Sequence, residues 1–567
     1  MVKTWVFADN DQNDQVEELA KVLNISNSIA KILYRRGIVD FNSARTFFRP
    51  TLDQLHDPFL MQDLGKAVNR LGEAIFAGDQ ILIYGDYDVD GTTSVALLYK
   101  FLRKFSDQLE CYIPDRYTEG YGISEKGVRH AHSSGAKLMI ALDCGIRAIE
   151  QAQLAKSLGI DLIICDHHLP GDSLPDAFAV LDPKRQDCQY PYKELSGCGV
   201  GFKLLQGFCI QNTIPLIQLY ELLDFLVVSI AADIVPITGE NRVLAFYGMR
   251  RLNESPAVGI RALTDIAGFK GRLTITNVVF GIAPRINAAG RIGHALEAVK
   301  LLVSENQEEA DQIASKINDQ NIERKDLDKQ ITEEAIRMIE AQENAVDLST
   351  TVLYKEEWHK GVIGIVASRC IEKYYKPTII LTSSNGMITG SARSVKGFDI
   401  HTAIAKCGDL LEQFGGHKYA AGLTMKAENL NAFRQEFEKA VKTHITEEQT
   451  QVKLLIDAEV TLPDLTFKFH NILEQMAPFG PANMKPVFVT RNLNIKGIPR
   501  LLKEEHVKMT LLDMDANKNI DAIAFGFGEI YENLLRAESI DVAYYLEINE
   551  YMGNKSLQLM VKDIKLN

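Results

Sequence analysis

The 567-residue chain is predicted to be an α/β protein, with two α/β domains joined by a long helix and a C-terminal OB-like β-barrel. Between residues 80 and 235, short apolar runs alternate with helix-period segments, which is typical of a parallel sheet covered by helices. Residues 295–342 are dense in charge and contain no Pro or Gly, as in a long solvated helix. After residue 452, five short β-rich runs follow one another, which favours a small barrel.

The composition is ordinary for a globular protein, and the length predicts three or four units with cores of their own. The longest apolar stretch, from Phe225, is shorter than a membrane span and contains Asp233. The first residues lack the apolar core of a signal peptide, so we expect a cytoplasmic protein without a membrane segment. The net charge of -13 argues against indiscriminate nucleic-acid binding but allows a nucleic-acid enzyme with local basic surfaces.

The N-terminal segment, residues 1–50, is predicted to be helical. The helical pattern extends to about residue 79, interrupted at 48–61 by FRPTLDQLHDPFLM, which we interpret as an extended crossing segment. This part of the chain shows no recognisable chemistry. The first α/β domain is assigned to residues 51–294.

Acidic residues follow the predicted strands of this domain. The run ILIY (81–84) precedes Asp86, LMIAL (138–142) precedes Asp143, and DLIIC (161–165) precedes Asp166. Asp233 is expected at the end of a fourth strand. Because ligands of parallel sheets gather beyond the carboxyl ends of the strands, these acids are expected at one edge of the sheet.

The stretch GDYDVDGTT places Asp86, Asp88 and Asp90 at alternating positions. Carboxylates this close repel one another unless a cation or a hydrogen-bond donor compensates them. One interpretation is an Asp-rich surface turn in which Thr92 caps the next helix. The other is a cation site, with Gly91 as the tight exit from the turn.

Two adjacent histidines, His167 and His168, favour the cation site because they directly follow an apolar strand and neighbour the strand-end acids. The eight cysteines contain no pair at two-residue spacing, so thiolate ligands are not expected. Carboxylates and imidazoles without thiolates suit Mn²⁺ or Mg²⁺. Several strand ends together have enough ligands for two ions.

The C-terminal half is divided into three parts. The helix over residues 295–345 is expected to bridge two lobes, although packing on one domain alone is an open alternative. The second α/β domain is assigned to 346–450, where strand and helix patterns alternate again around Gly-rich turns. The barrel is assigned to 452–567, with strands in PVFVTRNLNIKGI, HVKMTLLDM, NIDAIAFGFG, VAYYLEINEY and SLQLMVKDIKL.

The motifs DYDVDG, DCG, DHH and AADIVP resemble the four motifs of the DHH phosphoesterases, and FGGHKYAAG resembles the GGH motif of the DHH-associated domain. Within that superfamily the order is similar to the RecJ group, which are 5′ to 3′ single-strand-specific exonucleases. The narrowing features are GYG (120–122), SGCGVGFKL (196–204), PRINAAGR (284–291), WHKGVIGIVASR (358–369) and PFGPANMKPVF (478–488). The resemblance covers about residues 50–567.

The resemblance implies roles for individual residues. The implied metal ligands are Asp88, Asp90, Asp143, His167, His168 and Asp233. Asp143 is the implied bridging ligand, and Asp143, His167 and Asp233 are the implied catalytic residues. Asp86 and Asp166 match acids that do not bind the metal themselves but orient its ligands and fix the imidazole tautomers.

Further residues are candidates for binding DNA phosphates. They are Arg285, Asn287, Arg291, Ser391, Arg393, Gly416 and His417. Planar guanidinium groups grip phosphates, and Gly-rich turns let backbone N–H groups approach an anion. The alternatives are a helix cap with structural arginines and an ordinary turn.

The barrel has a basic stretch of its own. Its six basic residues are Lys485, Arg491, Lys496, Arg500, Lys503 and Lys508. Basic grooves on such barrels bind single strands, but an ordinary solvated face is an equally open interpretation.

The implied activity is metal-dependent hydrolysis of single-stranded DNA from the 5′ end to 5′-mononucleotides, in recombination and repair. The implied enzyme is a monomer that works on single-stranded DNA beside a single-strand-binding protein. The alternatives are a small-substrate DHH phosphodiesterase, of the nanoRNase or cyclic-dinucleotide type, and a non-catalytic DNA-binding scaffold. Two departures from the family pattern are Ala482-Asn483-Met484, where GNP is common, and His294, where an acid is common.

Overall fold

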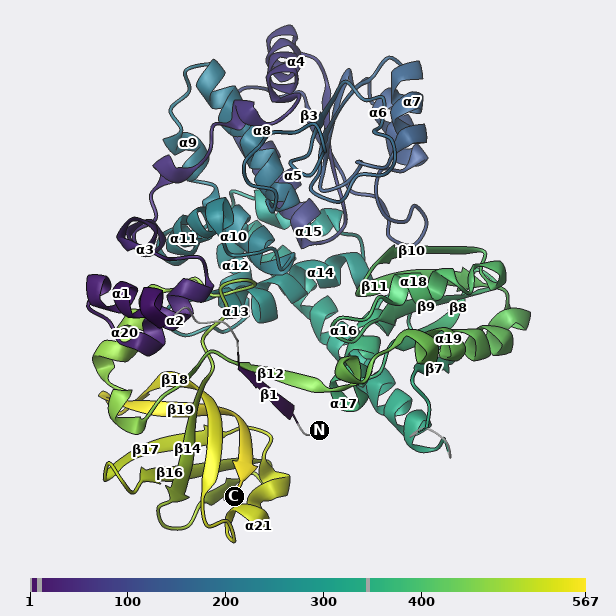
Figure 1. Cartoon of the computed structure of the whole chain (residues 1–567). Helices are drawn as coiled ribbons and strands as arrows, with labels where there is room; N and C mark the ends of the chain where they lie inside the picture. Colours follow the sequence, from purple (N-terminus) through teal and green to yellow (C-terminus); the bar gives the residue numbers. More distant parts are fainter. Residues whose placement is uncertain (1–2, 8–12, 343–346) are drawn as a thin grey trace. The chain divides into compact units, whose positions relative to one another are not determined.

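The computed structural model describes residues 3–7, 13–342 and 347–567. It confirms the predicted fold class: two separate α/β sheets, a long helix and a C-terminal β-barrel (Figure 1). The chain divides into two compact units, which are described separately. One comprises residues 5–283, 302–307 and 454–567, and the other residues 284–301 and 308–453 with the first few residues of the chain.

The first α/β domain is built on a five-stranded parallel sheet. Its strands, in the order β3-β2-β4-β5-β6, are Leu109–Tyr112, Ile81–Gly85, Leu138–Leu142, Asp161–Cys165 and Ala179–Leu181. All residues of β2 and β4 are buried, which explains their continuous apolar sequence. Because every pairing is parallel, the carboxyl ends of the strands lie at one edge.

Helices cover this sheet. They are α4 Leu64–Ala77, α5 Val89–Leu102, α6 Glu125–Ser133, α7 Ile149–Ser157 and α8 Gly197–Gln211. Four more helices follow in the chain, α9 Ile217–Tyr220, α10 Leu223–Ala232, α11 Gly239–Glu254 and α12 Val258–Ile266, of which α11 packs on α10. Helices α5, α8 and α10 pack on one another. The start of α5 and the end of α10 are thereby brought to the edge where the strands end.

The linking region differs from the expected single helix over 295–345. A short helix, α13 Ile275–Asn277, leads into the π-helical turn η3 Val278–Ile282 and α14 Ala283–Ile292. Helix α15, Leu296–Val303, then ends, and α16 begins at Gln307 and runs to Glu340. The break lies at residues 304–306, where the Ser304 hydroxyl hydrogen-bonds the Asn306 carbonyl. The 34-residue α16 confirms a long helix, and residues 343–346 lie outside the described part.

The second α/β domain has a mixed five-stranded sheet, in the order β10-β11-β9-β8-β7. Its strands are Gln413–His417, Ala420–Met425, Met387–Arg393, Thr378–Ser384 and Thr351–Tyr354. Only β7 and β8 pair in parallel. The covering helices are α17 Ile363–Tyr374, α18 Ile400–Ala405 and α19 Leu430–His444.

The C-terminal domain confirms the five predicted strands as a closed barrel. They are β14 Phe488–Ile495, β16 His506–Asp513, β17 Lys518–Ala524, β18 Ile540–Tyr551 and β19 Asn554–Leu566. The sheet order β14-β18-β19-β17-β16 closes through pairing of β16 with β14. Two short strands, β13 Ala458–Glu459 and β15 Arg500–Leu502, extend it, and helices α20 Phe467–Gln475 and α21 Tyr531–Leu534 complete the domain.

The N-terminal segment is helical from Asn13 onward, with α1 Asn13–Leu23, α2 Asn27–Arg35 and α3 Phe41–Phe48, but the prediction was wrong for Lys3–Phe7, which form a β-strand. The sequence did not reveal that its apolar residues, such as Leu19 and Leu33, share one hydrophobic core with the barrel. Strand β1, Lys3–Phe7, pairs with β12, Val452–Ile456. The crossing segment contains two short 3-10 turns, Leu52–Gln54 and Pro58–Leu60.

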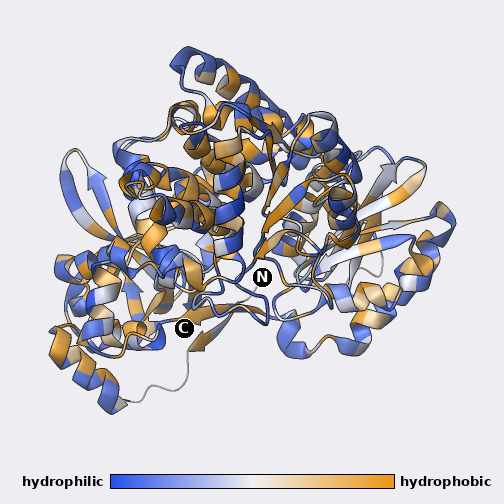
Figure 2. Ribbon diagram, turned by 90° about the horizontal axis from the view of Figure 1, so that it is seen from above, coloured by the Kyte–Doolittle hydropathy of each residue, from blue (hydrophilic) through white to orange (hydrophobic). Residues whose placement is uncertain are grey.

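Apolar and polar residues alternate along the helices of both units (Figure 2). Within residues 3–7, 13–342 and 347–567, no helix is long and apolar enough to cross a membrane.

Candidate metal centre

The acids predicted at the ends of strands meet at one edge of the parallel sheet. Asp86 follows β2, Asp143 follows β4, and Asp166 follows β5. The expectation for Asp233 was wrong: it follows helix α10 and caps its C-terminus. Nine of the ten residues of α10 are buried, and a helix that is apolar on all sides has no helical period by which to distinguish it from a buried strand.

The turn after β2 is fixed by its own backbone. Asp88 is the N-cap of α5 and accepts a 3.0 Å hydrogen bond from the Gly91 amide. The predicted cap, Thr92, is therefore wrong, and its hydroxyl instead donates to the Asp88 carbonyl at 2.7 Å. Gly91 is required because a Cβ there would lie 2.3 Å from the Asp86 carbonyl oxygen.

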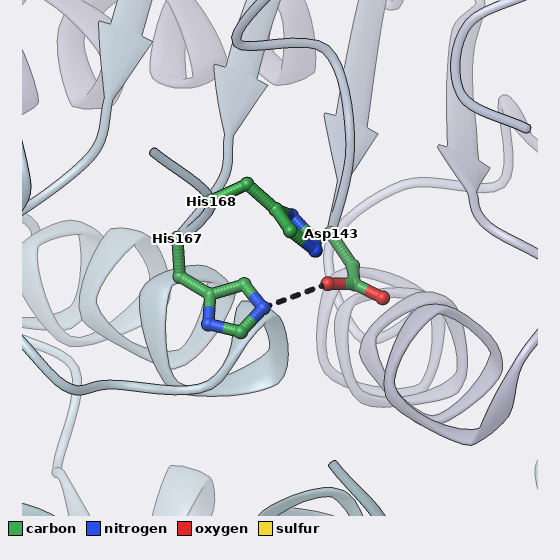
Figure 3. A group of neighbouring side chains, drawn as sticks. All are labelled: Asp143, His167 and His168. Atoms are coloured by element: carbon green, nitrogen blue, oxygen red, sulfur yellow. Dashed lines mark ion pairs between the residues drawn. The ribbon is translucent and has the colours of Figure 1, made fainter. Parts of the chain in front are cut away.

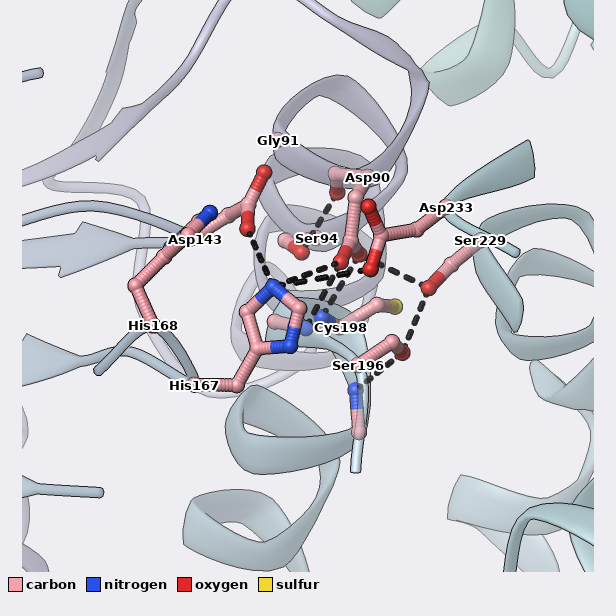
Figure 4. A network of polar contacts seen from close by, with 12 residues as sticks. Asp90, Gly91, Ser94, Asp143, His167, His168, Ser196, Cys198, Ser229 and Asp233 are labelled. Carbon is pink, nitrogen blue, oxygen red and sulfur yellow. Dashed lines mark hydrogen bonds and ion pairs between the residues drawn. The ribbon is translucent and has the colours of Figure 1, made fainter. Parts of the chain in front are cut away.

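Asp90 is oriented by residues more than 100 positions away. Its carboxylate accepts hydrogen bonds from the Gly197 amide at 2.7 Å and the Cys198 amide at 2.8 Å, at the start of α8. The Ser229 hydroxyl on α10 donates at 2.7 Å (Figure 4). The favourable N-terminal end of α8 thus holds this carboxylate in one orientation.

His167 lies at the centre of the acids. Its Nε2 is 3.2 Å from Asp143 Oδ1, 3.6 Å from Asp233 Oδ2 and 3.8 Å from Asp90 Oδ2 (Figures 3 and 4). Burial lowers the pKa of His167 to about 4, so the ring is neutral near pH 7. A neutral imidazole has a lone pair, which is what a metal ligand needs.

His168 is held through Asp166, whose carboxylate accepts from His168 Nδ1 at 2.8 Å and from the Ile146, His167 and His168 amides. Burial raises the pKa of Asp166, but the hydrogen bond and charge of His168 outweigh burial and lower it to about 2. Burial likewise lowers the pKa of His168, and Asp166 raises it to about 9. Asp166 thus has the supporting position expected of it.

Asp86 was expected to orient other ligands, but its position is that of a candidate metal ligand itself. It is 1% exposed, and within the described part of the chain neither carboxylate oxygen accepts a hydrogen bond of good geometry. The backbone amides of Tyr87 and Gly122 lie close enough to oppose the effect of burial on its pKa, but they do not outweigh it. Burial and the neighbouring Asp88 raise its pKa well above the ordinary value. Its oxygens lie in one group with ligand atoms of Asp88 and Asp143, all within 4.8 Å.

Two further groups of the same size complete the centre, Asp143 with His167 and His168, and Asp90 with His167 and Asp233. Within the described part of the chain, five buried polar atoms of this centre have no hydrogen-bond partner of good geometry: both oxygens of Asp86, Oδ1 of Asp143 and both nitrogens of His167. Clustered buried carboxylates are unfavourable unless cations neutralise them. The donor set and its vacant lone pairs fit hard divalent cations such as Mn²⁺ or Mg²⁺.

Sequence reasoning missed three contributors to this centre. Ser196 and Ser229 bridge α8 and α10 through their hydroxyls at 2.6 Å, and Ser229 continues to Asp90. The Tyr121 hydroxyl lies 3.2 Å from His168 Nε2. The available signals were the Ser-Gly-Cys-Gly start of α8 and the Gly120-Tyr121-Gly122 motif.

The candidate phosphate ligands of the second unit lie on neighbouring elements. Arg285 donates to Asn318 on α16 at 3.0 Å, and Arg291 donates to the Gly361 carbonyl at 2.8 Å, just before α17. Asn287 lies between them on α14 and is half-buried.

The other four candidates of this unit lie on its sheet. Arg393 and Ser391 hydrogen-bond at 3.0 Å on β9, and a Cβ at Gly364, in the first turn of α17, would contact both. Gly416 and His417 are exposed on β10, two strands from β9. The sheet and the start of α17 thus bring Ser391 and Arg393 together, whereas Gly416 and His417 remain on the edge strand.

The six basic residues predicted on the barrel have different surroundings. Arg500 on β15 and Lys503 just after it are exposed, and Lys508 on β16 is half-buried. Lys485 pairs with Glu547 at 2.7 Å, and Arg491 pairs with Glu459 and Asp541. A groove of about 900 Å³ lies elsewhere on the barrel, and Lys496 is the one residue of the six that lines it. The groove is lined further by Lys518, Lys555, Thr510, Asn519 and Phe467, among others.

The two departures from the family pattern have local explanations. His294 Nδ1 accepts a 3.2 Å hydrogen bond from the Leu296 amide at the start of α15, as an acid would. Asn483 is 1% exposed and donates to the Met476 and Pro478 carbonyls, while Ala482 has a φ of 59°, in the left-handed region that favours the Gly of the family pattern. The turn therefore keeps the hydrogen bonds of Asn483, although Ala482 adopts a left-handed backbone conformation that is unfavourable for alanine.

Comparisons with known proteins cover the whole chain. Family models match for the DHH family N-terminal domain at residues 80–230, the DHHA1 domain at 347–443 and the RecJ OB domain at 456–563. The single-stranded-DNA-specific exonuclease RecJ of Bacillus subtilis is 37% identical over 99% of this chain and 70% of its own length. That of Escherichia coli is 33% identical over 88% of this chain and 89% of its own.

A solved structure agrees with these matches. The crystal structure of RecJ from Thermus thermophilus in complex with Mn²⁺ superposes with a TM-score of 0.86 at 26% identity, covering 99% of this chain and 79% of that one. The chain therefore belongs to the RecJ family of single-stranded-DNA-specific exonucleases.

Proposed function

We propose that this chain hydrolyses single-stranded DNA from its 5′ end and releases 5′-mononucleotides, using two Mn²⁺ or Mg²⁺ ions, in DNA recombination and repair. The observation that carries the proposal is the cluster around His167 Nε2, where three carboxylates approach one neutral imidazole and buried lone pairs have no partner. Metal-bound RecJ structures from Thermus thermophilus support the choice of Mn²⁺ or Mg²⁺.

The proposed ligands are Asp88, Asp90, Asp143, His167, His168 and Asp233, to which the geometry adds Asp86. Asp143 contributes to two of the three ligand groups, one with Asp86 and Asp88 and one with His167 and His168, which supports a bridging role. Two ions held there would activate water and neutralise charge on the phosphoryl oxygens.

The chain's own residues set up this chemistry. The start of α8 and Ser229 orient Asp90, and Asp166 orients His168 and fixes its tautomer. The nearby hydroxyls of Ser196 and Ser229 are engaged with each other and with Asp90, which supports a reaction without a protein nucleophile.

We assign two regions to binding the DNA strand. Ser391 and Arg393, beside the N-terminal turn of α17, combine a guanidinium with helix N–H groups, which suits a terminal phosphate. On the barrel, the groove with Lys496, Lys518 and Lys555 has exposed Phe467 at its edge, which suits a phosphate chain with stacked bases. Arg285, Asn287, Arg291, Gly416 and His417 remain proposed phosphate contacts.

Digestion of end-labelled single strands, with and without Mn²⁺, tests the proposal by reading polarity and product length together. We expect mononucleotides from the 5′ end, dependence on the ion, and loss of activity in Asp143→Ala. A small-substrate phosphodiesterase would stall on strands longer than a few nucleotides, and a DNA-binding scaffold would bind them without release. Either outcome would refute the exonuclease assignment.

We further propose a cytoplasmic location, a monomeric state and cooperation with a single-strand-binding protein. Light scattering of the purified chain tests the oligomeric state. Co-purification with single-strand-binding protein on coated DNA tests the partner.

A further inference from the structure

The segment 115–124 carries the Gly120-Tyr121-Gly122 motif, to which neither the sequence nor the proposed chemistry gives a role. Gly120 and Gly122 have φ values of 83° and 85°, in the left-handed region that favours glycine. Tyr121 lies between these two turns. Its hydroxyl is 3.2 Å from His168 Nε2, and the two rings meet edge to face with centroids 6.0 Å apart. Tyr121 is thus one contact of this segment with the metal centre, and the Gly122 amide, which acts on Asp86, is another.

A buried carboxylate fixes the shape of the segment. The Glu119 side chain is 4% exposed and accepts four hydrogen bonds. Its Oε2 accepts from Tyr112 at 2.9 Å and from the Ser124 hydroxyl at 2.6 Å, and its Oε1 accepts from the Asp115 amide at 3.0 Å and from Lys126 at 3.3 Å. Burial raises the pKa of Glu119, but these donors outweigh burial and lower it.

The far end of the segment is attached to the central strand β2. The Tyr84 hydroxyl donates to the Gly122 carbonyl at 2.8 Å and accepts from the Ser124 amide at 3.1 Å. The Tyr84 ring is fully buried and stacks on Tyr112 with centroids 5.4 Å apart. Asp86 lies two residues beyond Tyr84 in the chain. Strand β2 therefore positions both the segment, through Tyr84, and the first acid of the centre.

We propose that Glu119 is a positioning residue of the metal centre, which holds Tyr121 against His168 so that the imidazole is fixed between Tyr121 and Asp166. The inference rests on the proposed function of this centre. His168 Nδ1 hydrogen-bonds the Asp166 carboxylate at 2.8 Å, which leaves Nε2 as the nitrogen for a metal ion. Tyr121 lies beside that edge of the ring, with its hydroxyl 3.2 Å from Nε2 and its own ring edge to face with the imidazole, and so keeps Nε2 directed at the centre. Removal of the Glu119 carboxylate leaves four donors without their acceptor, so the turn that presents Tyr121 loses its anchor.

The test compares Glu119→Ala, Glu119→Gln and Tyr121→Phe in the full-length chain. We expect Glu119→Ala and Tyr121→Phe each to lower kcat by about 10-fold or more, as outer partners of metal-site histidines do, with KM for single-stranded DNA unchanged. Glu119→Gln is expected to restore most of kcat, because its oxygen still accepts from Asp115 and its amide can donate to the hydroxyls of Tyr112 and Ser124.

A double mutant separates positioning from simple stability. If Glu119 acts through Tyr121, then Glu119→Ala lowers kcat by less than about 2-fold in the Tyr121→Phe background. Effects that multiply, or a Glu119→Ala enzyme with unchanged kcat, would overturn the proposal. If Glu119→Ala does not fold, Tyr112→Phe is the substitute, because it removes one hydrogen bond to Glu119 and keeps the ring stacked on Tyr84. An unchanged kcat in Tyr112→Phe would also overturn the proposal.

Mn²⁺ affinity, measured by electron paramagnetic resonance of the free ion, gives a readout independent of turnover. We expect a weakening of about 10-fold in Glu119→Ala and Tyr121→Phe. The matched control is Glu125→Ala, an exposed carboxylate at the start of α6 that pairs only with Arg129 among the contacts of the described chain, and it should change neither quantity. If the wild-type chain released no nucleotides, the proposed function would fail, and the Mn²⁺ affinities would still decide the role of Glu119.

Discussion

Replacing Asp143 by Asn removes one buried charge from the metal-free centre. Asp143 is 2% exposed, and its ligand oxygen lies within 4.8 Å of ligand oxygens of Asp86 and Asp88. Burial and the neighbouring carboxylates raise its pKa well above the ordinary value. Its φ is 59°, a left-handed conformation that Asn adopts readily, so the substitution should preserve the backbone.

The size of the effect follows from two limits. Two unit charges 4.8 Å apart repel by about 3.5 kcal/mol at an effective dielectric constant near 20. Protonation relieves this repulsion, and keeping a carboxyl with an ordinary pKa of 3.8 neutral at pH 7 costs about 4 kcal/mol. We therefore expect Asp143→Asn to raise the free energy of unfolding of the metal-free protein by about 2–4 kcal/mol near pH 7.

The pH dependence has a definite sign. A carboxyl whose pKa is raised on folding destabilises the folded state as the pH rises above its unfolded pKa of about 4. Below that pH the carboxyl is neutral in both states. The stability difference between Asp143→Asn and the wild type should therefore shrink towards zero near pH 4 and open as the pH rises.

Urea unfolding in EDTA, followed by far-UV circular dichroism, measures this difference at about pH 4.5 and about pH 7.5. Adding Mn²⁺ should then stabilise the wild type and have little effect on Asp143→Asn. The control is Asp176→Asn, an exposed carboxylate paired with Lys156, which should change stability by less than about 1 kcal/mol. A variant less stable than the wild type at pH 7.5 in EDTA would refute the assignment of a repulsive, cation-requiring cluster.

Three further predictions follow from single contacts. Asp166→Asn should lower kcat and Mn²⁺ affinity by about 10- to 100-fold, because His168 loses its charged partner; equal affinity by Mn²⁺ titration would contradict this. Ala482→Gly should raise the melting temperature because it relieves a φ of 59°. Asn483→Ala should lower the free energy of unfolding by about 2 kcal/mol because the Met476 and Pro478 carbonyls lose their donor. Thermal unfolding measures both, and an Ala482→Gly variant that melts below Asn483→Ala would be inconsistent with the turn described. Lys203→Met should lower the free energy of unfolding in urea by about 3–5 kcal/mol, because it leaves Glu240 buried without its cation. The control Lys156→Met breaks an exposed ion pair and should lower it by less than about 1 kcal/mol. Similar losses in the two variants would show that burial does not decide the cost.

The sequence by itself determined the parts of this protein that are encoded locally. Apolar runs placed Asp86, Asp143 and Asp166 at strand ends, because a buried parallel strand is a continuous apolar segment and the residue after it marks its end. The charge-dense, Gly-free stretch predicted α16, and five short β-rich runs predicted the five strands of the closed barrel. Motif order then predicted the family.

The break in the linking region was not visible in this way. Residues 304–306 contain neither Pro nor Gly, so no helix breaker marks the break between α15 and α16. The signal that was available is a helix start, with Asn306 as an N-cap residue type three positions before Glu309 in the acidic first turn of α16. Thr92 was likewise a reasonable cap by residue type. Asp88 is the cap because the exit of β2 places its carboxylate over the Gly91 amide.

Only the tertiary structure decided which residues act together. Asp90 is oriented by amides at 197 and 198, the N-terminal helices complete the core of a barrel more than 400 residues later, and Lys485 and Arg491 are paired with acids from other strands. Asp86 accepts no hydrogen bond of good geometry within the described chain, and the backbone amides of Tyr87 and Gly122 only partly offset its burial, whereas Asp166 accepts four hydrogen bonds, although both follow apolar strands. The physical reason is that the pKa and the free lone pairs of a carboxylate depend on burial, on nearby charges and on donors, and the fold brings these from positions that sequence spacing does not relate.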